Sequence, residues 1–365
     1  MKKIGIIIPW FGEFRIDFNF WVKSIEFNPT VDFLLFTDQQ IEIPIPNNLK
    51  VFKTSLREIE ELARKTVWEG CVISKPYKLC DYKVAYGEIF HEYLMDYDFW
   101  GHCDMDMYFG NIRKFITEEI LNKYDRIGNN GPFTLYKNRP DINAIYHKVD
   151  DIKIVFSDQQ PFGFDEWGLN QNGASPYWMK NFPERLWNGV VYDNLVPYHY
   201  SFVSYSLKSN EQDVRNLMFS FDNGKLSAYG TLNGVVFSTE RMYVHIQKRP
   251  IIIKTECNSR FSIIPSGKIV PFIENVTYSY LKWHIRDSKF WAYYVRLRNK
   301  INSLLNKAPY SDMILFPNDD FYKGIFEKPF YYKILKLLKD FKLSLCQLFL
   351  LSSHSIIKSL LLNAL

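Results

Sequence analysis

Short apolar runs separated by helical patterns mark the first third of the chain. Residues 4–9 and 31–38 are nearly continuous apolar runs of strand length and predict buried strands, and residues 49–53 suit a third. A helix is predicted between the first two strands, over residues 18–27. The hydrophobic pattern therefore begins as strand, helix, strand.

The same alternation continues for about another eighty residues. Ser55, with Glu58 three residues further on, has the spacing of a capping box that begins a helix. A longer helix is predicted over residues 77–94, followed by strands over residues 98–107 and 133–136. Strands separated by helices are typical of βαβ units, so we predict an α/β fold with a mostly parallel sheet and flanking helices.

The pattern weakens beyond residue 150. Residues 156–205 are rich in Gly, Asn, Pro, Trp and Tyr and predict loops and short elements, which commonly carry binding surfaces. Strands are predicted over residues 230–238 and 242–246, and a hairpin over residues 261–272. From residue 278 the pattern is helical, basic and aromatic.

Composition indicates a folded protein, because 47% hydrophobic and 23% charged residues are ordinary values for a globular chain. The aromatic share of 17% is high. Aromatic rings supply buried area and also stack on sugars, so the excess suits either a core or a ligand platform. Five cysteines without a Cys-x-x-Cys pair argue against a disulfide framework or a zinc knuckle.

The net charge of +5 is divided unevenly along the chain. Residues 1–281 sum to −3 and residues 282–365 to +8, and the acidic body argues against a nucleic-acid partner. We expect a catalytic domain over residues 1–272 and a helical, basic C-terminal region over residues 273–365. The amphipathic pattern of residues 333–342 suits an interfacial helix on anionic lipid, or a terminal helix packed on the domain or on a dimer partner.

The N-terminal apolar run is too short for a signal peptide, and Pro9 follows it instead of a small-residue cleavage site. We therefore expect a cytoplasmic protein. If the C-terminal helix binds lipid, the protein would make a peripheral contact with the cytoplasmic face of the inner membrane.

The sharpest local motif is FWGHCDMDMYFG, residues 99–110. Asp104 and Asp106 stand two residues apart, and alternate residues of a strand point to the same face. Both carboxylates could therefore bind one hard divalent cation and its phosphates. Open α/β sheets bind ligands at the carboxyl ends of their strands. The competing interpretation is a solvated turn after the strand.

Four segments together resemble a known family of enzymes. FWGHCDMDMYFGNI is similar to the DxD region of GT-A-fold, nucleotide-sugar-dependent glycosyltransferases. With IIIPWFG, FTD and KPYKLCDYKVAYG, it resembles bacterial glycosyltransferases of capsule and lipopolysaccharide synthesis, over about residues 3–250. The resemblance implies a GT-A, Rossmann-like sheet, a UDP-sugar donor and Mn²⁺ or Mg²⁺. The implied acceptor is a glycan or lipid-linked glycan of a growing capsule or O-antigen.

The resemblance also implies that the donor nucleotide contacts the ends of the first two strands, at Pro9, Trp10, Phe11, Gly12, Thr37 and Asp38. Lys83 would lie near the diphosphate or the carboxylates, where a cation offsets charge on the leaving group. Lys78 joins the donor-binding candidates, although its spacing to Asp81 equally suits an exposed ion pair.

Two further segments resemble glycosyltransferase family 8. FDEWGLNQN, residues 164–172, is similar to its Asp-Gln-Asp-x-Leu-Asn segment, with Trp167 in place of the second Asp. The resemblance implies that Asp165 or Glu166 contacts the donor sugar or the acceptor hydroxyl, as a general base if the reaction inverts configuration. The residues alone suit a helix start, where acidic side chains favour the positive end of the dipole.

The second such segment is YVHIQKRP, residues 243–250. The resemblance implies that His245 completes a metal site with Asp104 and Asp106, and that Lys248 reaches the diphosphate. An imidazole with two carboxylates is a reasonable set of ligands for a divalent cation. The alternative is a histidine buried in the core.

These observations predict a metal-dependent glycosyltransferase that transfers a sugar from a UDP-sugar to a growing surface polysaccharide. We expect nine aromatic residues to form its acceptor site: Tyr177, Trp178, Phe182, Trp187, Tyr192, Tyr198, Tyr200, Phe202 and Tyr205. A sugar nucleotidyltransferase is less well supported, because WFGEFR has one Gly and one Arg where such enzymes carry a phosphate-gripping loop. A noncatalytic glycan-binding or scaffold protein remains the other alternative.

Overall fold

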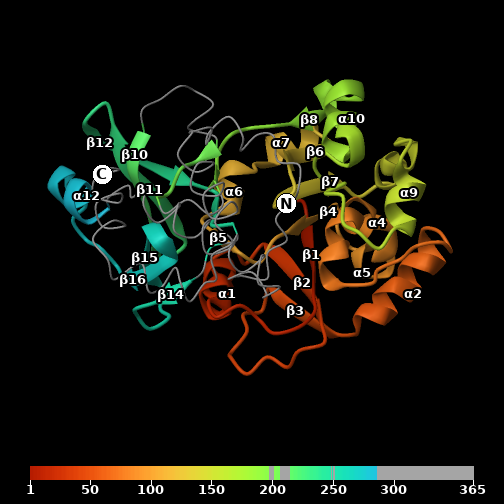
Figure 1. Ribbon diagram of the computed structural model, residues 1–365, viewed down its shortest axis with the longest axis horizontal. Helices are drawn as coiled ribbons and strands as arrows, with labels where there is room; N and C mark the ends of the chain where they lie inside the picture. The colour runs from red at the N-terminus through yellow and green to blue at the C-terminus, as the bar shows by residue number, and fades with distance from the viewer. Residues whose placement is uncertain (197–200, 206–213, 248, 250, 286–365) are drawn as a thin grey trace, which may run out of the picture. The chain divides into compact units, whose positions relative to one another are not determined.

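The computed structural model describes residues 1–196, 201–205, 214–247, 249 and 251–285 (Figure 1). Lys248, Tyr198, Tyr200 and the predicted C-terminal helices beyond residue 285 lie outside these residues. Within the described part, the chain is a mixed α/β protein with three sheets.

The first sheet consists of β1 Ile4–Trp10, β2 Val31–Thr37, β3 Leu49–Lys53, β4 Phe99–Cys103, β6 Arg126–Asn130, β7 Phe133–Lys137 and β8 Leu186–Trp187. Their order is β3-β2-β1-β4-β7-β6-β8. The predicted parallel pairing is confirmed for β1 to β4. β7 instead runs antiparallel to both β4 and β6, so the sheet is mixed, with a parallel half.

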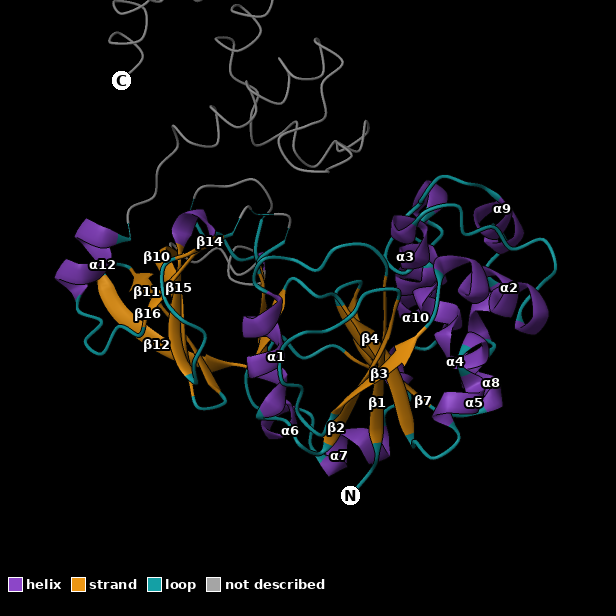
Figure 2. Cartoon of the chain, turned by 90° about the horizontal axis from the view of Figure 1, so that it is seen from below, coloured by secondary structure: helices purple, strands orange, loops and turns teal. Residues whose placement is uncertain are grey.

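Alternate residues of the parallel strands enter two different cores. Ile6 and Ile8 pack in a cluster with α1 (Phe18–Glu26), whereas Ile7 packs in a cluster with α2 (Leu56–Thr66). Figure 2 shows these two helices on opposite sides of the sheet. β1, β2 and β4 are mostly apolar because they are buried on both faces, which is why the sequence reveals them, whereas β3 has two exposed lysines. The predicted capping box is confirmed, since Ser55 and Glu58 bond each other's backbone at the start of α2.

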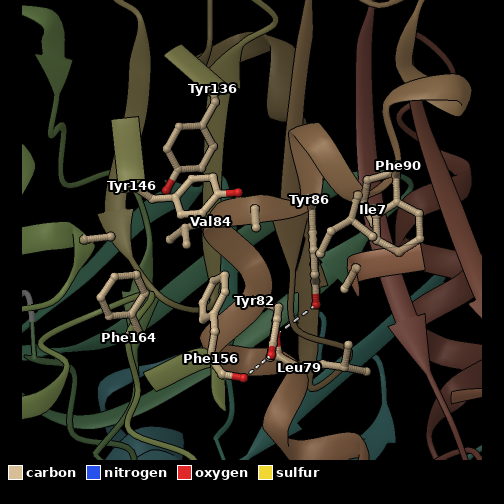
Figure 3. Packing of buried hydrophobic residues seen from close by; sticks show 14 of the residues in the cluster. Ile7, Leu79, Tyr82, Val84, Tyr86, Phe90, Tyr136, Tyr146, Phe156 and Phe164 are labelled. Carbon is tan, nitrogen blue, oxygen red and sulfur yellow. Dashed lines mark hydrogen bonds between the residues drawn. The ribbon is translucent and has the colours of Figure 1, made fainter. Parts of the chain in front are cut away.

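The single helix predicted over residues 77–94 is wrong. The segment consists of short pieces that alternate between 3-10 and α winding: η1 Pro76–Lys78, α3 Leu79–Tyr82, η2 Lys83–Ala85, α4 Tyr86–Ile89 and α5 His91–Leu94. Every residue from 81 to 87 is buried, so packing on all sides decides the winding. Figure 3 shows Tyr82 in this core, where its hydroxyl donates to the Phe156 carbonyl at 2.6 Å.

The second sheet consists of β10 Val214–Asp222, β11 Lys225–Leu232, β12 Val235–Arg241, β14 Ile252–Ile253, β15 Arg260–Ile264 and β16 Lys268–Pro271. The single strand predicted over residues 230–238 is wrong, because this segment spans the β11–β12 hairpin. The hairpin turns at Asn233 (φ 52°) and Gly234 (φ 81°), and Asn and Gly tolerate this left-handed backbone best. The hairpin predicted over residues 261–272 is confirmed by antiparallel β15 and β16.

A third, small sheet consists of β5 Met107–Phe109, β9 Asp193–Asn194 and β13 Tyr243–His245. The strand predicted over residues 98–107 therefore ends early, because the chain turns between β4 and β5. β13 runs antiparallel to β5 and places His245 opposite Met107. Tyr108 of β5 packs in one buried cluster with Phe219 and Phe261 of the second sheet.

The described residues of the region 156–205, which are 156–196 and 201–205, form loops and short elements, as predicted. The remaining helices are α6 Ile112–Phe115, α7 Glu118–Lys123, α8 Pro140–Asn143, η3 Ile145–Lys148, α9 Ile152–Ser157, η4 Leu169–Gln171, α10 Ala174–Asn181, η5 Pro183–Arg185, η6 Pro265–Gly267 and α12 Tyr278–His284. α12 begins the predicted C-terminal region and packs on β10 and β11. Among the described helices, none has the length and apolar character needed to cross a bilayer.

Candidate functional site

The site begins where the parallel strands end. β1, β2 and β4 run in the same direction, so their carboxyl ends share one edge of the sheet. Asp104 and Asp106 occupy the turn that follows β4, not the strand itself, and the Asp104 amide donates to the Pro132 carbonyl at 2.9 Å. Met105 is buried in the core between them. The buried methionine anchors the turn, and the two flanking carboxylates remain partly exposed.

His245 reaches these aspartates from the far end of β13. Its Nε2 lies 3.0 Å from Asp106 Oδ1 and 3.9 Å from Asp104 Oδ2. The backbone holds this position, because the Ile246 amide donates to the Asp106 carbonyl at 3.0 Å. One ligand atom from each of the three side chains lies within 4.8 Å of the other two. Two carboxylates and an imidazole at this spacing fit a single divalent cation.

Lys83 joins this group to a second pair of acids. Its ammonium donates to Asp104 Oδ1 at 2.7 Å and to the Gly131 carbonyl at 2.8 Å, and lies 3.2 Å from Asp165 Oδ2. Burial by itself would lower the pKa of Lys83, but Asp104 and Asp165 outweigh it and hold that pKa well above its usual value. Lys83 therefore stays charged and fixes the distance between the two carboxylates.

Asp165 is buried, with 6% of its surface exposed. Burial raises the pKa of its carboxyl group to about 7, although the nearby Lys83 opposes the shift. Its neighbour Glu166 accepts a hydrogen bond from the Gly131 amide through Oε1 at 2.9 Å. A Cβ atom at residue 131 would lie 2.6 Å from both Asp165 Oδ2 and Glu166 Cγ. Only glycine allows the backbone to approach both acids this closely.

Asp165 and Glu166 lie in a closed loop and do not start a helix, since α10 begins only at Ala174. The loop is closed by hydrogen bonds from the Ala174 amide to the Phe164 carbonyl and from the Ser175 amide to the Glu166 carbonyl. Two non-glycine residues in it, Asn170 and Gln171, have positive φ angles of 52° and 63°. Such angles are unfavourable for residues other than glycine and persist where the surroundings enforce them, often at functional sites.

A model of a family of unknown function (DUF6625) matches residues 6–271, from β1 to β16. The chain belongs to the DUF6625 family. The matched region contains all the residues of the acidic cluster described above. No curated protein matches the chain.

In this DUF6625 protein, the predicted nucleoside-binding residues lie at the same sheet edge. The Gly12 amide donates to Asp38 Oδ1 at 3.0 Å, so the loop after β1 is tied to the end of β2. Gly12 and Asp38 are exposed, whereas Thr37 and Phe11 are buried. Pro9 and Trp10 are partly exposed. Hydrogen bonds from Gln39 and Gly12 lower the pKa of Asp38, against the opposing effect of burial.

The structure does not bring Lys78 into the cluster. Its fully buried ammonium donates to Asp81 Oδ2, to the Val155 carbonyl and to the Gln160 carbonyl at 2.6–2.8 Å. The Lys78–Asp81 ion pair suggested by the spacing does form, at 2.8 Å, but it is buried and not exposed. Asp81 also accepts from the Phe162 and Phe164 amides at 3.0–3.1 Å. In the DUF6625 protein, this pair anchors the segment that leads to Asp165.

The predicted aromatic platform is mostly core. Trp178, Tyr192 and Phe202 are buried, and Tyr177, Phe182 and Trp187 pack against the apolar clusters. Tyr205 is partly exposed. An aromatic ring outside the predicted platform is the exposed one: Trp167, which follows Glu166 in the chain, has 54% of its surface exposed. Sequence reasoning noted Trp167 only as a departure from a motif.

Sequence reasoning also missed Gly131 and Arg15. Gly131 lies between β6 and β7, and nothing in the sequence connects it with Asp165. Arg15 lies in the loop between β1 and α1, and its nearness to a strand end was an available signal.

Proposed function

We propose that this DUF6625 protein is a metal-dependent glycosyltransferase of the GT-A type. Its donor would be a UDP-sugar, and its acceptor a glycan or lipid-linked glycan of a growing surface polysaccharide. The observation that carries the proposal is the convergence of Asp104, Asp106 and His245 at the carboxyl edge of the parallel strands. The histidine reaches this edge only through β13, far along the chain, so the cluster is not a by-product of local sequence.

Asp104, Asp106 and His245 would hold Mn²⁺ or Mg²⁺. A bound divalent cation supplies Lewis-acid stabilisation of the charge that develops on a departing diphosphate. The protein contributes the fixed geometry, because the backbone pairing of β5 with β13 and the buried Met105 set the positions of the three side chains. Pre-set positions of this kind avoid reorganisation when charge develops.

Lys83 and Asp165 supply the chemistry next to the cation ligands. Lys83 stays charged and, from its contact with Asp104, can stabilise negative charge on the donor. Asp165 has a pKa of about 7, which suits a group that holds or releases a proton near neutral pH. Glu166 is fixed by the Gly131 amide, and the exposed ring of Trp167 beside it offers a surface for an acceptor sugar.

The experiment is UDP release from a panel of UDP-sugars by the purified chain, with Mn²⁺ and with EDTA. We expect release with at least one donor and Mn²⁺, and its loss in EDTA. Asp106→Ala should abolish release. A matched control is Asp96→Ala, because Asp96 is exposed and precedes β4 at the opposite edge of the sheet. Absence of metal-dependent UDP binding and release from the wild type would refute the proposal.

A further inference from the structure

The proposed donor brings phosphate charge to an acidic cluster, and this inference rests on the function proposed above. Among the described residues, Asp104 and Asp165 contact the Lys83 ammonium, and Glu166 accepts a hydrogen bond from the Gly131 amide. A nucleoside diphosphate brings two or three more negative charges, so a site that binds it needs further cationic groups.

Arg15 is a cation of this kind, in the loop between β1 and α1. Its Nε donates to Asp17 Oδ1 at 3.0 Å and its Nη2 to Asp17 Oδ2 at 3.2 Å. This two-point pairing fixes the plane of the guanidinium. The side chain still has 21% of its surface exposed. Its Nη1 has no hydrogen-bond partner within the described part of the chain, so the N–H groups on this side of the guanidinium can donate to a ligand.

The Asp17 side chain pairs with Arg15 and does not cap the helix that follows it. It occupies the N-cap position of α1, yet its side chain makes no capping hydrogen bond. An Asp at this position ordinarily caps the helix. Here the buried carboxylate accepts from Arg15 and, at 2.5 Å, from the Tyr108 hydroxyl. The pairing with Arg15 takes the place of the cap.

Tyr108 connects this pair to the cation ligands. It lies in β5, two residues after Asp106, and β5 pairs with the strand that carries His245. Arg15 also lies within electrostatic reach of Asp106. Burial lowers the pKa of Arg15, but Asp106 and then Asp17 raise it above its usual value. The Asp17–Tyr108 hydrogen bond and this electrostatic attraction place Arg15 on the Asp106 side of the cluster, whereas Lys83 contacts Asp104.

We propose that Arg15 binds a phosphate group of the nucleotide beside Asp106, with Asp17 and Tyr108 as the residues that position its guanidinium. A planar fork matches two phosphate oxygens, which an ammonium does not. Lys83 is already engaged by two carboxylates and a carbonyl. Arg15 therefore adds a two-point phosphate contact to the positive charge that Lys83 supplies.

The test is calorimetric titration of the full chain with UDP in saturating Mn²⁺, together with Mn²⁺ binding measured by electron paramagnetic resonance without nucleotide. Arg15→Ala should raise the Kd for UDP about tenfold or more, the loss expected for a charge-assisted contact. Arg15→Lys should recover part of the affinity, and Tyr108→Phe should lose part. The Mn²⁺ affinity should stay the same or increase, because a cation beside Asp106 has been removed.

Arg57→Ala is the matched control, since its side chain is 87% exposed on α2 and pairs with Glu61. If Arg15→Ala binds UDP as the wild type does, the inference is wrong while the proposed function stands. If Arg15→Ala loses Mn²⁺ and UDP together, Arg15 supports the fold and the inference is also wrong. If the wild type binds no UDP with Mn²⁺, the proposed function itself fails.

Discussion

Replacing Asp165 by Asn should change how the stability of the protein depends on pH. The pKa of the folded carboxyl group is raised to about 7 by burial, against about 4 in an unfolded chain. The folded state therefore binds the proton more tightly than the unfolded state does. The stability that this proton contributes is fully present below about pH 4 and is lost as the pH rises through 7.

The size of the effect follows from the two pKa values. A carboxyl group whose pKa is about 4 in the unfolded chain and about 7 in the folded protein changes the stability with pH. Between pH 5 and pH 8, its loss of the proton lowers the free energy of unfolding by roughly 2.5 kcal/mol. Asn has the same shape and no proton to lose, so Asp165→Asn should lack this decline. From pH 5 to pH 8, the free energy of unfolding of Asp165→Asn should therefore rise by roughly 2.5 kcal/mol relative to that of the wild type.

The assay is urea unfolding of the wild type and Asp165→Asn at pH 5 and pH 8, in EDTA so that no cation binds the cluster. Asp96→Asn, at an exposed position, serves as the control and should follow the wild type at both pH values. If the wild type and Asp165→Asn change in parallel between the two pH values, Asp165 is ionised like an ordinary surface carboxylate. Asp165 would then hold no proton near neutral pH, and its proposed role in proton transfer would be wrong.

Two further predictions concern the framework of the site. Lys78→Met should lower the free energy of unfolding by about 3–5 kcal/mol, because it leaves buried Asp81 without its partner; a loss below about 1 kcal/mol in urea unfolding would contradict this. Gly131→Ala should reduce UDP release at least about tenfold, because the new methyl group displaces Asp165 and Glu166. Mn²⁺ binding should persist in Gly131→Ala, and an unchanged rate of UDP release would show that the positions of the two acids do not matter.

The parallel half of the first sheet could be predicted because its signal is local. β1 and β2 are buried on both faces, so each is a short, nearly continuous apolar run in the sequence. The second sheet was harder, although two Asn-Gly pairs mark its hairpins. Asn223 and Asn233 both have positive φ and precede a glycine with positive φ, which is a strong hairpin signal.

The remaining errors have a common cause in tertiary packing. Residues 81–87, in the middle of the segment over residues 77–94, are all buried, so they carry no amphipathic period from which the breaks could be read. The approach of His245 to Asp106 depends on the pairing of β13 with β5, which no local pattern encodes. Only the resemblance suggested that contact. It could not reveal Arg15 or Gly131, whose roles arise from contacts within this chain.

The proposed metal site is tested most directly by anomalous diffraction at the manganese edge, from crystals of the full chain grown with Mn²⁺ and UDP. We predict one strong peak within coordination distance of Asp104, Asp106 and His245, with the diphosphate beside it. A peak elsewhere, or UDP bound away from the carboxyl edge of β1 and β4, would contradict the proposed function.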